Sequence, residues 1–94
     1  MSLAAELEKL VSKYIAGVER VFKELRVLAD DSKVLEVVNH AKRYFDDAKF
    51  FAEKADFKTA LVSIAYCEGL LDALKALNFV DFSWRKNEET ASNQ

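Results

Sequence analysis

Residues 32–78 read SKVLEVVNHAKRYFDDAKFFAEKADFKTALVSIAYCEGLLDALKALN, and this stretch decides the fold. Apolar side chains recur in it at steps of three and four, the spacing that places them on one face of an α-helix. Asp56 separates two such runs, and its short acidic side chain is typical of a helix N-cap. The stretch therefore predicts two helices, at residues 32–54 and 56–78, joined by a turn short enough to make them antiparallel neighbours.

The residues before this stretch continue the helical pattern. Residues 3–29 carry one apolar stripe, made by Leu3, Leu7, Leu10, Tyr14, Val21, Leu25 and Leu28. The cluster at residues 30–32 supplies N-cap candidates for the next helix. We therefore expect an all-α fold, an antiparallel up-down-up three-helix bundle that forms a single domain over residues 1–84. Residues 85–94 are polar and are expected to be a disordered tail.

Composition and charge exclude several other classes of protein. The 94 residues include no proline and two glycines, which argues against a turn-rich β sandwich. The 14 basic and 16 acidic residues are too evenly balanced for a nucleic-acid footprint, so nucleic acid is not an expected partner. No stretch approaches the roughly 18–20 apolar residues of a membrane span. We expect a cytoplasmic protein without a membrane segment.

The residue types that most often carry chemistry are sparse. Cys67 is the single cysteine, and it falls on the predicted core stripe, where a thiol behaves as a small hydrophobe. His40 is the single histidine and lacks the Glu-x-x-His spacing of a di-iron bundle. Gly17 and Gly69 are isolated within helices and form no phosphate-binding loop. The sequence therefore predicts no catalytic residue, no dedicated metal site and no cofactor.

Two tyrosines and two aspartates form the most polar candidate site. Pairing the helices by level places Tyr44 beside both Tyr66 and Gly17, so we expect one layer in which the missing side chain of Gly17 admits a ring. Replacing Gly17 with Leu should then overpack that layer. With Asp47 and Asp72, the two tyrosines would form a rim between the second and third helices. That rim either satisfies the hydroxyls structurally or binds a small ligand or a metal ion.

The third helix has more apolar surface than a three-helix bundle needs. A second apolar stripe, made by Val62, Tyr66, Leu70, Ala73 and Leu77, runs beside its core stripe. We take Phe50, Val62, Leu70 and Leu77 as a candidate interaction surface. Such a surplus must meet either the aromatic segment at residues 79–84 or another chain.

The second and third helices also resemble a known family. The pattern comprises a tyrosine, two aspartates and an alanine within residues 44–48, an acidic and an aromatic residue at 56–57, and Tyr-x-x-Gly-x-x-Asp at 66–72. It resembles the archaeal domain-of-unknown-function 357 family. This resemblance implies a three-helix bundle with no assigned activity and no catalytic residues to transfer. Two positions depart from the family pattern, because Ala55 stands where a helix-ending glycine is usual and Leu70 where a tryptophan is common.

Function is predicted only in outline. The surplus apolar surface favours a non-enzymatic helical protein–protein interaction module, self-associating through the third helix as a homodimer or binding another protein. The alternative is a small-ligand or metal-binding helical domain that uses the rim of Tyr44, Asp47, Tyr66 and Asp72.

Overall fold

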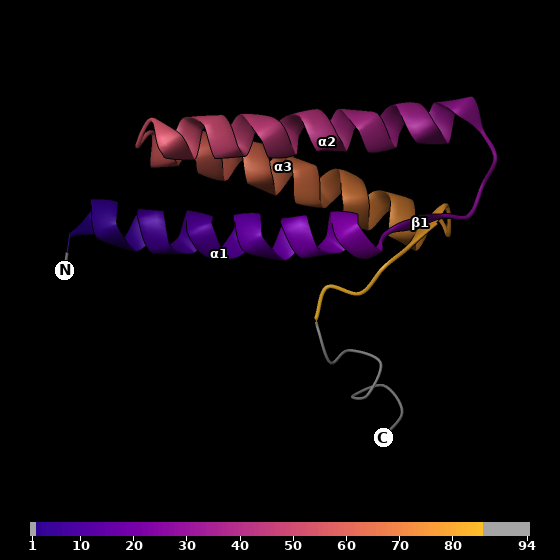
Figure 1. The fold of residues 1–94 in the computed structure, drawn as a ribbon, viewed down its shortest axis with the longest axis horizontal. Helices are drawn as coiled ribbons and strands as arrows, with labels where there is room; N and C mark the ends of the chain where they lie inside the picture. The colour runs from indigo at the N-terminus through magenta and orange to yellow at the C-terminus, as the bar shows by residue number, and fades with distance from the viewer. Residues whose placement is uncertain (1, 86–94) are drawn as a thin grey trace, which may run out of the picture.

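The computed structural model describes residues 2–85 and confirms the three-helix fold. The elements in chain order are α1 (Leu3–Glu24), β1 (Arg26–Val27), α2 (Ser32–Glu53), α3 (Phe57–Ala76) and β2 (Val80–Asp81). Consecutive helices run antiparallel, and α3 lies between α1 and α2 in the view of Figure 1. Most contacts between helices join α3 to α2, and α1 touches α2 least. Apart from Arg85, the expected tail at residues 85–94 lies outside the described residues.

Each helix begins where the sequence supplies a capping side chain. The caps are Ser2, Asp31 and Asp56, whose side-chain oxygens accept hydrogen bonds from backbone N–H groups two or three residues further on. These bonds satisfy donors that the first turn of a helix leaves unpaired. Because Asp56 is itself the cap, α3 begins one residue later than predicted.

The two later helices end in Schellman motifs built without glycine. At the end of α2, Ala55 has a φ of 62°, and its N–H donates to the carbonyl of Ala52 at 3.0 Å. The N–H of Asp56 donates to the carbonyl of Phe51 at 2.9 Å, which completes the motif. Asn78, also with a φ of 62°, ends α3 in the same way. The two helices therefore end one and two residues before the predicted ends.

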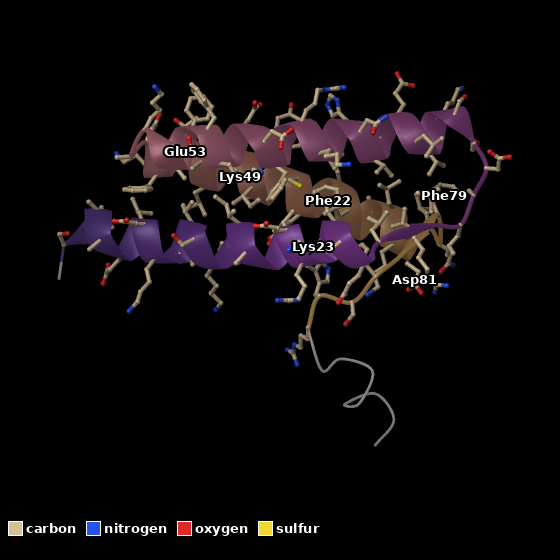
Figure 2. The ribbon with its side chains drawn as sticks, viewed as in Figure 1. Phe22, Lys23, Lys49, Glu53, Phe79 and Asp81 are labelled. Atoms are coloured by element: carbon tan, nitrogen blue, oxygen red, sulfur yellow. The ribbon has the colours of Figure 1, made fainter. Side chains whose placement is uncertain are left out.

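The end of α1 differs most from the prediction. Leu25 is already extended, with φ −60° and ψ 132°, and Arg26–Val27 then pair antiparallel with Val80–Asp81. Figure 2 shows this end of the molecule at Phe79, opposite the α2–α3 turn beside Glu53. The expectation of a helix through residue 29 is wrong, because the chain there bonds to a segment more than fifty residues away.

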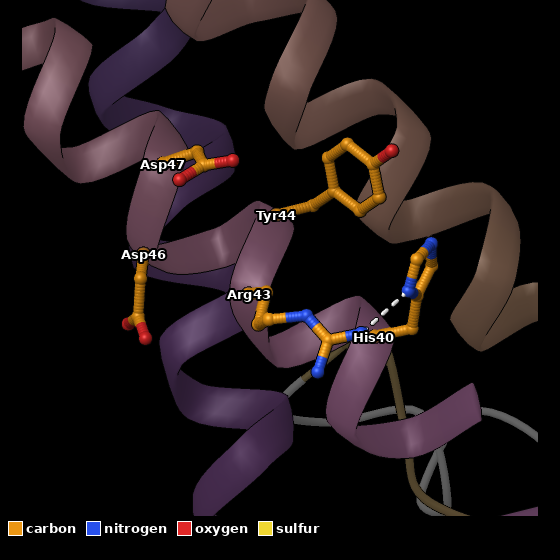
Figure 3. Close-up of a pocket in the computed structure, with 5 residues that line it drawn as sticks. All are labelled: His40, Arg43, Tyr44, Asp46 and Asp47. Carbon is orange, nitrogen blue, oxygen red and sulfur yellow. Dashed lines mark hydrogen bonds between the residues drawn. The ribbon is translucent and has the colours of Figure 1, made fainter. Parts of the chain in front are cut away.

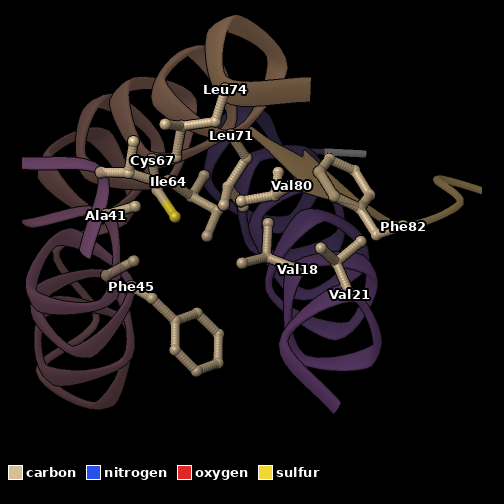
Figure 4. Close-up of a cluster of buried hydrophobic side chains, with 12 residues drawn as sticks. Val18, Val21, Ala41, Phe45, Ile64, Cys67, Leu71, Leu74, Val80 and Phe82 are labelled. Atoms are coloured by element: carbon tan, nitrogen blue, oxygen red, sulfur yellow. The ribbon is translucent and has the colours of Figure 1, made fainter. Parts of the chain in front are cut away.

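All three helices and the segment after α3 share one core (Figure 4). Its buried members are Val18, Val21, Val34, Ala41, Phe45, Ala48, Ile64, Cys67, Leu71, Leu74, Val80 and Phe82. The predicted stripes of α2 and α3 supply most of these residues. On α1, however, Val11 and Val18 are fully buried outside the predicted stripe, while Leu3 of that stripe is exposed; Leu28, which follows β1, is exposed as well. Val18 and Val21 share the core cluster with Val80 and Phe82, so the buried face of α1 is the one that carries its valines.

The aromatic segment after β2 folds back onto the helices. Phe82 is buried, and the ring of Trp84 meets it edge-on with 4.9 Å between centroids. The indole N–H of Trp84 donates to Oδ1 of Asp72 at 2.6 Å, and the Arg20 guanidinium donates to the Trp84 carbonyl. This segment therefore lies against α1 and the adjacent side of α3.

The predicted layer of Gly17, Tyr44 and Tyr66 is wrong in one member. The tyrosine rings do stack, with centroids 4.4 Å apart and 28° between their planes. A Cβ on Gly17, however, would meet no atom within 4 Å, so no ring occupies that space. Gly17 instead lines a groove with Trp84. The open space beside Gly17 removes the ground for expecting that Leu at this position overpacks the bundle.

Candidate functional site

The stacked tyrosines anchor an aromatic and basic cluster on α2. His40 meets Tyr44 edge-on, with 5.2 Å between ring centroids. Nη2 of Arg43 lies 2.8 Å from Nδ1 of His40, and since a guanidinium can only donate, Nδ1 is the acceptor. The bond therefore fixes the histidine tautomer with its proton on Nε2. Spacings of three and four residues on one helix bring these side chains together.

Asp47 lines a shallow pocket beside this cluster. The pocket has a volume of about 310 Å³ and is formed by His40, Arg43, Tyr44, Asp46 and Asp47 (Figure 3). Figure 3 shows the rings of His40 and Tyr44 on the α3 side of α2, whereas Asp46 points the other way. One helix supplies all five residues, so within residues 2–85 no second element lines the pocket.

Asp72 does not join the predicted rim. It accepts the indole N–H of Trp84, on a different side of α3 from Tyr66. The structure therefore brings together Tyr44 and Tyr66, places Asp47 next to Tyr44, and separates Asp72 from them. Within residues 2–85, no group of three or more His, Cys, Asp or Glu side chains is placed to hold a metal ion.

The outer face of α3 is the second candidate site. We use this name for the exposed, uncharged residues Val62, Ala65, Tyr66, Gly69, Ala73, Ala76 and Leu77. Val62 is 68% exposed and Leu77 is 62% exposed. Of the predicted interaction surface, these two residues lie fully on the face, and Leu70 lies at its edge, half-buried. Phe50 is also exposed, but it lies on α2, where its ring contacts Phe51 and Lys54.

An apolar groove adjoins the outer face between α2 and α3. It has a volume of about 270 Å³ and is lined by Asp31, Lys33, Val34, Val37, Leu70, Ala73, Leu74, Leu77 and Phe79. Leu77 and Ala73 belong to both the groove and the outer face. The two features therefore form one continuous apolar surface, with a groove at the strand-pair end and the projecting Val62 at the other.

Burial raises the pKa values of two ionisable groups of α3, the Cys67 thiol and the Glu68 carboxyl. Burial raises the pKa of the Cys67 thiol to about 12, and the charge of Glu68 adds to that shift. Burial, and then the charge of Asp72, raises the pKa of the Glu68 carboxyl. Cys67 is fully buried, and this position supports the predicted role of its side chain in packing.

The sequence did not point to Trp84 or Arg20 as site residues. Both line a groove between α1 and α3, and their contact joins residues 64 positions apart. The only sequence signal was the cluster of aromatic residues at positions 79–84, which showed that this segment is apolar but not where it packs.

Residues 13–80 match the family described as protein of unknown function, DUF357. The chain belongs to this family. The match runs from α1 to β2 and so extends well beyond the pattern quoted from the second and third helices. No curated protein and no solved structure matches this DUF357 chain. Within residues 2–85, no helix of the DUF357 chain is long and apolar enough to cross a membrane.

Proposed function

We propose that this protein is a non-enzymatic interaction module that self-associates through the outer face of α3. One observation carries the proposal: Val62 and Leu77 project into solvent at 68% and 62% exposure, and the helix face between them bears no charge, Lys58 lying one turn before Val62. Isolated exposed apolar residues are ordinary, but a continuous apolar helix face beside an apolar groove is typical of a docking surface.

The charged residues of α3 support this reading because three of them lie away from the outer face. Asp72 bonds to Trp84, Lys75 lies over the Phe82 ring at 4.9 Å, and Glu68 lines the groove between α1 and α3. The aromatic segment therefore covers the charged side of α3. The surplus apolar surface of α3 could meet either the aromatic segment or another chain. Because the aromatic segment lies on the charged side, we assign the outer face to contact with another chain.

The layout of the face suits an antiparallel pair of identical helices. Small residues at positions 65, 69 and 73 occupy its middle, where they would let two helix backbones approach closely. In a two-fold arrangement centred on Gly69, Val62 of one copy lies level with residue 76 of the other. It would therefore sit beside the apolar groove at Leu77. A projecting residue at one end and a groove at the other make the surface self-complementary, as a two-fold interface requires.

A non-enzymatic role is supported by the environment of Cys67 and Ser63, two side chains of α3 of the types that act as nucleophiles. Cys67 and Ser63 are both buried, and the raised pKa of Cys67 disfavours the reactive thiolate. A ligand-binding role for the predicted rim has less support, because Asp72 bonds to Trp84 and lies apart from the stacked tyrosines.

The oligomeric state tests the proposal. Light scattering after size-exclusion chromatography, over a hundredfold range of protein concentration, should show a dimer that dissociates on dilution. Val62→Lys and Leu77→Lys each place a charge in the interface and should weaken dimerisation at least about tenfold. Leu35→Lys is the matched control, because Leu35 is also an exposed apolar residue but lies on α2. A dimer that both lysine variants leave intact, or a monomer at every concentration, would refute self-association through α3.

A further inference from the structure

A groove between α1 and α3 has the features of a ligand site that neither the family nor the proposed function assigns. Its volume is about 530 Å³, within the usual range for small-molecule sites. It is lined by Lys13, Gly17 and Arg20 of α1, by Glu68 of α3 and by Trp84. It shares no residue with the outer face of α3, so the two sites can be tested independently.

The guanidinium of Arg20 is the unusual group in this groove. Within residues 2–85 it forms no ion pair with a carboxylate, and one of its nitrogens donates to the Trp84 carbonyl. Its Nε is buried and has no hydrogen-bond partner. Glu68 does not neutralise it either, because a carboxylate paired with a guanidinium would have a lowered pKa, whereas that of Glu68 is raised. The groove therefore holds a guanidinium that forms no ion pair within residues 2–85.

Two aromatic side chains, Trp84 and Tyr14, and the open position at Gly17 also line the groove. Trp84 is held in place by its indole bond to Asp72 and by its edge-on contact with Phe82. Tyr14 also lines the groove, so aromatic side chains come from two separate segments. At Gly17 a Cβ would meet nothing within 4 Å, so the absence of a side chain there keeps the groove open rather than admitting a packed residue.

We propose that this groove binds a small anionic molecule with a flat, unsaturated body. A phosphate or carboxylate group would pair with Arg20 and Lys13, the two cations that line the groove. The ring of the ligand would lie against Trp84, whose position is fixed before binding. Glu68, on the opposite side, would accept from a polar N–H or O–H group of the ligand.

Trp84 is the only tryptophan of the chain, so its fluorescence reports directly on the groove. Titration with phenyl phosphate, and separately with benzoate, should quench it saturably with a Kd of about 1 mM or below. Benzyl alcohol, which lacks the charge, and inorganic phosphate at matched ionic strength, which lacks the ring, should each bind at least about tenfold more weakly. Calorimetry of the same titrations gives a second readout that does not depend on Trp84.

Two pairs of variants locate the binding. Arg20→Gln should weaken phenyl phosphate binding at least about tenfold, whereas Lys23→Gln removes the same charge from an exposed position on α1 outside the groove and should leave it unchanged. Gly17→Leu should fill the groove and abolish binding, whereas Ser12→Leu adds a leucine at an exposed position of α1 outside the groove and should not. Gly17→Leu should melt at or above the temperature of the parent, since glycine disfavours helix.

Three results would overturn the inference. The first is that phenyl phosphate and benzyl alcohol bind equally, which would remove the role of the anion. The second is that inorganic phosphate alone binds as well as phenyl phosphate, which would remove the role of the ring. The third is that a folded Gly17→Leu or Arg20→Gln variant binds as the parent does, which would place the site elsewhere.

Discussion

At the scale of single residues, Ala55 is an alanine in a backbone conformation that favours glycine. Its φ of 62° lies in the left-handed region, where the Cβ of an L-residue crowds the following carbonyl. The hydrogen bonds of the Schellman motif and the cap of α3 at Asp56 hold it there. The family pattern with glycine at this position is therefore explained by the backbone geometry that the turn requires.

Ala55→Gly should raise the free energy of unfolding by about 0.5–1 kcal/mol. Relief of the left-handed strain exceeds the extra entropy that glycine gives the unfolded chain. Ala52→Gly is the control, because Ala52 lies in the last turn of α2, where glycine should instead cost about 0.5–1 kcal/mol. Urea denaturation of both variants measures the two changes. A destabilised Ala55→Gly variant would contradict the strained geometry.

At the scale of elements, the β1–β2 pair decides where α1 ends. Its two strands have only two residues each, and Val27 pairs with Val80 across the ladder. Val80 is 2% exposed, whereas Val27 is 39% exposed. The pair is therefore held mainly by the burial of one side chain, because two strands this short contribute few hydrogen bonds.

Truncation of these paired valines should have unequal effects. Val80→Ala should lower the free energy of unfolding by about 2–3 kcal/mol, because it removes buried methyl groups from the core. Val27→Ala should cost less than about 1 kcal/mol, because that side chain is partly solvated. Thermal and urea unfolding compare the two directly. Equal costs would mean that the ladder, rather than the burial of Val80, anchors β2.

The elements also show which features the sequence could predict. The helices from residue 32 onward were predictable because caps, periodicity and a short turn all lie within a few residues of one another. The end of α1 was not predictable, because Leu25 and Leu28 keep helical spacing and the strand forms only by pairing with the distant residues 80–81.

The candidate site was also predictable only in part. Tyr44 and Tyr66 were predicted to meet, but the contacts of Asp72 and Arg20 with Trp84 depend on where the final segment packs.

At the scale of the whole molecule, Cys67 reports on the integrity of the bundle. It is fully buried in the core that all three helices share. Because burial raises its pKa to about 12, the native thiol is almost entirely protonated and unreactive at pH 8. Alkylation by iodoacetamide should then require the molecule to open. With an ordinary domain stability of about 5 kcal/mol or more, native labelling should be at least about a thousandfold slower than labelling in denaturant.

The extent of that opening can be determined by combining variants. If Cys67 is labelled only after global unfolding, Ala55→Gly must slow alkylation about two- to fivefold, in proportion to its gain in stability, although Ala55 lies in the turn before α3 and not in the core around the thiol. Val80→Ala must accelerate it by about 30-fold or more for the same reason. Ser12→Cys in a Cys67→Ala background is the control, because Ser12 is exposed on α1, and its thiol should react nearly as fast as in the unfolded chain. If Ala55→Gly changes stability but not the labelling rate, Cys67 is instead exposed by a partial opening. Detachment of α1, the helix with the fewest contacts to α2, would then be the first motion to examine.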